Sequence, residues 1–104
     1  METIEIIKAI FTSYAYNRDF SDMIKLCDEV LDRIHGWHSI DHTDDGNIIY
    51  GYIVLLWGEY GTSPRSGWLL HKTDVIIGCI ENLREEYKIL EAIENEQNLL
   101  YGRI

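Results

Sequence analysis

Apolar residues recur at helical spacing over most of the chain and predict three amphipathic helices. Steps of three and four residues between apolar positions run through 4–16, 21–35 and 74–98, the pattern of helices with one buried face. Ser21 is placed to cap the second of these helices, because its hydroxyl can accept a hydrogen bond from a free N–H group of the first turn. Gly36 suits the left-handed position that ends the same helix.

The segment 48–60 is apolar on every side. Its isoleucine, valine, tyrosine and tryptophan residues favour a strand, but its length and all-round apolar character favour a buried central helix. Gly61 suits a helix end, and the serine and proline that follow suit the start of another helical turn. The sequence thus predicts an all-α fold, a compact bundle of about four main helices around a central buried one. The alternative is an α+β fold with a hairpin that pairs 49–57 with 66–72.

The last helix is expected to begin after a cap at Thr73 and to be long. A heptad seam with steps of four and three residues follows it, through Ile76, Ile80, Leu83, Tyr87, Leu90, Glu94 and Gln97. Because the last two seam positions are polar, the apolar part is expected to pack on the domain, and the end to project, fray or pair with another chain. The seam extends further than so small a core requires, and this predicts a homodimer.

The length of 104 residues predicts a single domain spanning 1–104. The net charge of −9 argues against direct binding to a nucleic-acid backbone, which needs clustered basic residues. The longest wholly apolar run, 52–57, is far short of the about 20 residues that span a bilayer, even when it is widened to 48–57. Without a signal-peptide pattern, a cytoplasmic protein is expected. Cys27 and Cys79 have no metal-ligand or redox spacing, so both are expected to be buried and reduced.

Acidic residues gather on two of the predicted helices and suggest a function. No convincing catalytic set and no cofactor motif accompany them, so the leading hypothesis is a non-catalytic protein that inhibits or regulates a protein partner with a basic surface. Side by side, carboxylates can also imitate the phosphate spacing of DNA and occupy a basic cleft. The candidate partner-binding residues are Asp28, Asp32, Glu85, Glu86 and Glu91.

The corner at residues 57–72 supplies an alternative function. No acidic residue occurs from Tyr60 to Thr73, so this part of an acidic chain is locally positive. Basic side chains there could take phosphate charge, hydroxyls could donate hydrogen bonds, and aromatic rings could stack on a base. A protein that binds or sequesters a nucleotide signal would use Trp57, Tyr60, Thr62, Ser63, Arg65, Ser66, Trp68 and Lys72. A purely structural corner is the competing interpretation.

Three histidines and three aspartates lie within 35–45. On a helical turn His38 and His42 would share a face, as metal ligands do, and Asp45 could complete the set. No established metal motif accompanies them, so a solvated polar loop is the expected structure and no metal site is assigned.

The string YGTSPRSGW at 60–68 resembles a motif in small uncharacterised proteins of bacteriophages and prophages. The resemblance covers nine residues and carries over no functional residue. It implies a phage origin and a place in the bacterial host cytoplasm. Small acidic proteins without catalytic motifs are in that setting often inhibitors of host defence systems, which bind a protein or sequester a nucleotide signal.

Overall fold

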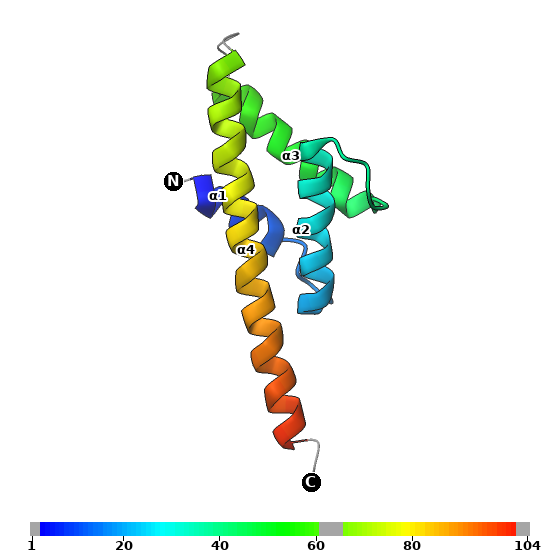
Figure 1. The fold of residues 1–104 in the computed structure, drawn as a ribbon. Helices are drawn as coiled ribbons and strands as arrows, with labels where there is room; N and C mark the ends of the chain where they lie inside the picture. Colours follow the sequence, from blue (N-terminus) through cyan, green and yellow to red (C-terminus); the bar gives the residue numbers. More distant parts are fainter. Residues whose placement is uncertain (1–2, 61–65, 102–104) are drawn as a thin grey trace.

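The computed structural model describes the backbone of residues 3–60 and 66–101, and the side chains of residues 4–55 and 73–99. All regular secondary structure in these parts is helical: α1 (Thr3–Thr12), α2 (Phe20–His35), α3 (Asp44–Tyr60) and α4 (Ser66–Tyr101). The predicted all-α class with four main helices is confirmed (Figure 1). The alternative hairpin is wrong, because 49–57 lies within α3 and 66–72 lies within α4.

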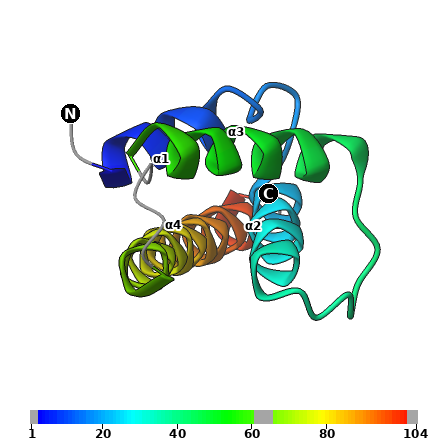
Figure 2. The ribbon, with the colours of Figure 1, turned by 90° about the horizontal axis from the view of Figure 1, so that it is seen from above.

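The four helices form two layers. Figure 2 shows α1 and α3 lying across α2 and α4, which run side by side in the other layer. The pair α2 and α4 makes the most extensive helix contact, and α1 and α3 each pack on this pair. One cluster of buried side chains fills the space between the layers, made of Ile7, Phe11, Met23, Leu26, Cys27, Val30, Ile49, Ile53, Ile76, Ile80, Leu83 and Tyr87. Every helix contributes to it, so helical spacing located the buried faces. In α2, however, the predicted stripe residues Ile24, Leu31 and Ile34 are only partly buried, and Met23, Leu26 and Val30 lie in the core instead.

The segment 48–60 is helical as predicted and lies within α3, but this helix is not buried all round. Of its described apolar side chains only Ile49 and Ile53 are buried, whereas Val54 is 40% exposed and Leu55 68% exposed. The expectation of a central buried helix is therefore wrong for the described part of α3. The physical reason lies in the layers: α3 packs on α1 and α2 from one side only, so its other face meets solvent.

Helix α2 starts and stops at clear capping residues. The carboxylate of Asp19, not the hydroxyl of Ser21, accepts the hydrogen bond of a first-turn amide, from Asp22 N at 2.9 Å. Ser21 is already inside the helix, so the predicted cap lies two residues too late. Gly36 ends the helix as predicted, at φ 71°, a left-handed conformation that favours glycine.

Helix α1 is shorter than the predicted 4–16 and ends at Thr12. The hydroxyl of Thr12 donates to the carbonyl of Lys8 at 2.7 Å, and that of Ser13 donates to the carbonyl of Ile10 at 2.6 Å. Such side-chain bonds compete with the helical pattern. The chain then turns through Asn17, which has a left-handed φ of 59°.

The last two helices begin earlier than expected. Helix α3 starts at Asp44, within the segment predicted to be a polar loop, and α4 starts at Ser66 and continues unbroken through Thr73. No proline follows Pro64, so nothing in the covalent chain forces a break at Thr73.

The second half of α4 projects from the bundle. Figure 1 shows it extending well past the end of α2, and the molecule is 61 Å long but only 29 by 20 Å across. Side chains from Lys88 to Leu99 are exposed, apart from the half-buried Glu91. The early seam positions Ile76, Ile80, Leu83 and Tyr87 are buried, as predicted, and the end projects, as predicted.

The cysteines are packing residues. Cys27 is fully buried and not in a disulfide, and its burial raises the pKa of the thiol to about 12, so the thiol is neutral. Cys79 is free and half-buried, which is less than the full burial predicted. Within the described parts of the chain, no helix combines the length and the apolar character needed to cross a membrane.

Candidate binding surface

Two acidic side chains of α2 face inward and hold the loop that leads to α3. Asp32 lies one turn after Glu29 and is 3% exposed. One of its oxygens, Oδ1, accepts hydrogen bonds from the amide of Ser39 at 3.1 Å and from the Ser39 hydroxyl. Its other oxygen, Oδ2, lies 2.7 Å from Nε2 of His42. Asp32 is therefore a structural anchor with little contact with solvent, and its predicted role in partner binding stays a prediction.

The anchoring by Asp32 predicts a loss of stability in acid. Hydrogen bonds from Ser39 hold the pKa of Asp32 at about 2, below the ordinary 3.8, against the opposing effect of burial. Because this pKa is lower in the folded than in the unfolded state, ionised Asp32 stabilises the fold fully above about pH 4. This contribution disappears as the pH falls through about 2. We expect Asp32→Asn to be less stable than the parent protein at neutral pH, but to lose less further stability in acid. Urea unfolding across this pH range measures both effects.

The exposed Asp41, in the same loop, gives the matched control, and Asp41→Asn should keep the acid sensitivity of the parent protein. Equal acid losses in Asp32→Asn and the parent protein would show that Asp32 does not carry the effect.

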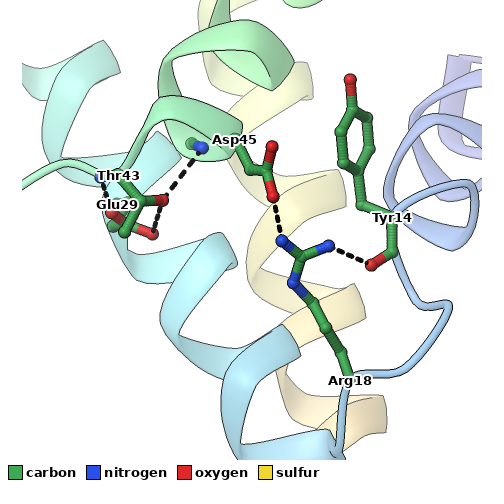
Figure 3. A network of polar contacts seen from close by, with 6 residues as sticks. Tyr14, Arg18, Glu29, Thr43 and Asp45 are labelled. Carbon is green, nitrogen blue, oxygen red and sulfur yellow. Dashed lines mark hydrogen bonds and ion pairs between the residues drawn. The ribbon is translucent and has the colours of Figure 1, made fainter.

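The second inward-facing acid, Glu29, caps α3 indirectly. Its Oε1 accepts from the amide of Thr43, and its Oε2 accepts from the Thr43 hydroxyl at 3.1 Å (Figure 3). The same hydroxyl accepts from the amide of Gly46 at 3.2 Å, in the first turn of α3. A Cβ atom at Gly46 would lie 3.2 Å from the Glu29 side chain, so this close approach of α3 to α2 favours glycine.

Arg18 ties the turn after α1 to the start of α3. Its Nη1 donates to the carbonyl of Tyr14 at 2.6 Å, and its Nη2 forms an ion pair and hydrogen bond with Asp45 (Figure 3). The sequence patterns gave no role to Arg18 or Thr43, and they placed Glu29 on the solvated acidic face of its helix, whereas it is 6% exposed. A threonine followed by two acidic residues is a recognisable helix start, and this signal could have identified Thr43.

An open cleft of about 830 Å³ lies over this network, between α2, the loop and the start of α3. Two apolar and two basic side chains line it with six carboxylates and one threonine: Leu26, Ile40, Arg18, Lys25, Asp22, Asp28, Glu29, Asp41, Asp44, Asp45 and Thr43. This lining holds no cysteine, histidine or serine, and the Thr43 hydroxyl is already bonded to Glu29. The cleft therefore offers a mainly negative surface for binding.

The other predicted partner-binding acids lie on or beside α4. Asp28 forms an ion pair with Arg84, with 2.5 Å between Oδ1 and Nε, and is 38% exposed. Glu85 is 62% exposed and lies 3.5 Å from the Lys88 ammonium group. Glu86 is 53% exposed and lies 3.2 Å from the ammonium group of Lys8 on α1. These acids do not form one continuous face, because Glu86 faces α1 while Asp28 belongs to α2.

The histidine-rich loop does not assemble the metal ligands considered for it. His42 contacts Asp32, Asp45 contacts Arg18, and the rings of His38 and His42 lie 6.4 Å apart. No group of three potential ligands occurs among the residues that the structure describes.

The proposed nucleotide site falls outside the described side chains. The residues concerned are Trp57, Tyr60, Thr62, Ser63, Arg65, Ser66, Trp68 and Lys72. The structure adds only that α3 ends at Tyr60 and α4 begins at Ser66. Nucleotide binding stays a prediction from sequence.

Comparisons with protein-family models, curated protein sequences and solved structures gave no match. A proposal for the function therefore rests on the chemistry of the described surface.

Proposed function

We propose that this chain is a non-catalytic acidic binding protein that inhibits or regulates a protein partner with a basic surface. The observation that carries the proposal is the projecting half of α4. Residues 85–99 contain five glutamates and one lysine, and nearly all their side chains are exposed. A helix that extends beyond its own core does not stabilise that core, so its exposed chemistry is available to another molecule.

The charge favours a basic protein surface over other partners. A net charge of −9 repels nucleic acid and anionic lipid, and attracts proteins rich in lysine and arginine. Opposite charges on two surfaces raise the rate of association and select the partner. The acidic cleft between α2 and α3 adds a second negative surface on the bundle.

The resemblance of 60–68 to phage proteins supports a more specific form of the proposal. In this form the chain is a phage-encoded inhibitor of a defence protein and acts in the bacterial cytoplasm. The seam on α4 also supports the homodimer expected from sequence, and in that case a second copy would compete with the partner for the same projecting half.

Charge neutralisation tests the proposal. In the variant Glu85→Gln/Glu86→Gln/Glu91→Gln, which changes two exposed glutamates and one half-buried one, we expect recovery of the natural partner from host lysate to fall by about tenfold, since each surface charge pair contributes about 0.2–1 kcal/mol. Quantitative mass spectrometry of the captured proteins measures the change. Added salt should slow association with the same partner.

The matched control Glu5→Gln/Asp74→Asn/Glu81→Gln removes the same charge at exposed sites away from the projecting half and from the acidic cleft. It should retain partner recovery close to that of the parent protein. Equal losses in both variants would assign the effect to net charge alone, and no loss in either would refute the proposal.

A further inference from the structure

One face of α4 is covered by α1 in the bundle. The side chains of Ile4 and Lys8 on α1 meet Cys79, Leu83 and Glu86 on α4 around a small crevice. Leu83 is 4% exposed there, and the Lys8 ammonium group lies 3.2 Å from a carboxylate oxygen of Glu86. This interface combines an apolar contact with a pair between a basic residue of the covering helix and a glutamate of α4.

The same face continues past α1 without a cover. From Cys79 the positions on this face recur after four, three, four and three residues, and the last two are Leu90 and Ile93. Leu90 is 43% exposed and Ile93 is 47% exposed, and the neighbouring Ile89 is 60% exposed. A helix surface that met only water would carry polar residues at these positions.

We propose that this uncovered stripe, formed by Ile89, Leu90 and Ile93, binds an amphipathic helix of the partner protein that carries lysine or arginine beside its apolar face. The inference rests on the proposed function and names the place and the kind of partner segment. The described part of α4 that extends past the bundle, from Lys88 to Leu99, is 12 residues long, or about 18 Å, which matches a partner helix of about three turns.

Two observations identify the occupant as a basic helix. The first is continuity with the α1 interface, where a lysine of the covering helix already pairs with a glutamate beside the apolar contact. The second is charge, because Glu85, Glu94 and Glu96 are exposed on the same projecting half.

A second copy of this chain is the competing occupant, and its charge fits less well. The half from 85 to 99 carries five glutamates against one lysine, so two copies would bring together two surfaces of net negative charge. A basic helix meets the same glutamates with opposite charge.

The direct test uses two synthetic 14-residue peptides and the full chain. Both peptides carry leucines at steps of three and four residues; one has lysines at the flanking positions and the other has glutamates. We expect fluorescence anisotropy to detect binding of the lysine peptide with at least tenfold higher affinity than binding of the glutamate peptide. No binding of the lysine peptide, or equal binding of both, would overturn the inference.

Two matched variants place the binding on the stripe. Ile89→Gln/Ile93→Gln should weaken binding of the lysine peptide at least tenfold. Ala92→Gln/Leu99→Gln changes two exposed apolar residues on another side of the same projecting half and should leave binding within about twofold. Because all four positions are exposed, both variants should fold, and circular dichroism confirms this. Equal effects of the two variants would overturn the assignment.

Light scattering shows whether a second copy of this chain, instead of a partner helix, occupies the stripe. A mass of 12.2 kDa at tens of micromolar supports a free stripe, whereas a dimer that Ile89→Gln/Ile93→Gln dissociates would assign the stripe to a second copy. If neutralising the glutamates abolishes capture of the natural partner but the stripe variant does not, the proposed function stands and this inference fails. If neither variant affects capture, both fail.

Discussion

Replacement of Phe11 by alanine should lower the free energy of unfolding by about 3–5 kcal/mol, the usual cost of removing a buried phenylalanine side chain. Phe11 is 0% exposed and lies in the core with Ile7, the other fully buried side chain of α1. Helix α1 has only 10 residues, too few to be stable alone in water, so its helicity depends on this packing. Urea unfolding followed by circular dichroism measures the change.

Tyr16 provides the control, since its side chain is 84% exposed in the turn that follows α1. Tyr16→Ala should change the free energy of unfolding by less than about 0.5 kcal/mol. A loss below about 1 kcal/mol in Phe11→Ala would contradict the position of α1 over the core.

Loss of the Glu29 carboxylate should destabilise the chain by about 2–4 kcal/mol. Glu29 is 6% exposed and accepts two hydrogen bonds from Thr43, so Glu29→Ala leaves the Thr43 amide without its acceptor beneath the loop. Glu29→Gln should cost less, because the amide oxygen still accepts one hydrogen bond while the Thr43 hydroxyl loses its acceptor. Thermal and urea unfolding of the two variants should place Glu29→Gln between the parent protein and Glu29→Ala.

Asp28→Ala is the matched control on the same helix. Its carboxylate is 38% exposed and its ion pair with Arg84 reaches solvent, so the expected loss is about 1 kcal/mol or less. A larger loss for Asp28→Ala than for Glu29→Ala would contradict the anchoring role of Glu29.

The helices could be predicted because the buried residues of one helix face recur every three or four positions along the chain. Ile76, Ile80 and Leu83 recur at the spacing of one helix face and all three are buried, so spacing alone located this part of the core. For α3 the spacing of apolar residues could not show which side is buried, since a helix that is apolar all round can be fully buried or can expose one side. Its exposed Val54 and Leu55 reflect how α1 and α2 are placed, which local sequence does not encode.

The candidate surface was harder to predict than the fold. Carboxylates on a helix are normally solvated, so Asp28, Glu29 and Asp32 look equivalent in sequence, although the last two are buried. Their burial depends on donors from Ser39 and Thr43 in a loop without periodic pattern. In contrast, the projection of α4 could be predicted from the sequence, because polar residues replace apolar ones at the end of its heptad seam.

The order of contacts has a consequence for synthesis on the ribosome. Helices α1 and α2 follow each other in the chain, yet the main packing partner of each is α4, which is made later. Until α4 leaves the ribosome, Phe11 on α1 and Val30 on α2 lack much of the surface that buries them. The nascent chain therefore exposes its apolar stripes for most of its synthesis, and a chaperone that recognises such stripes has its opportunity before α4 emerges.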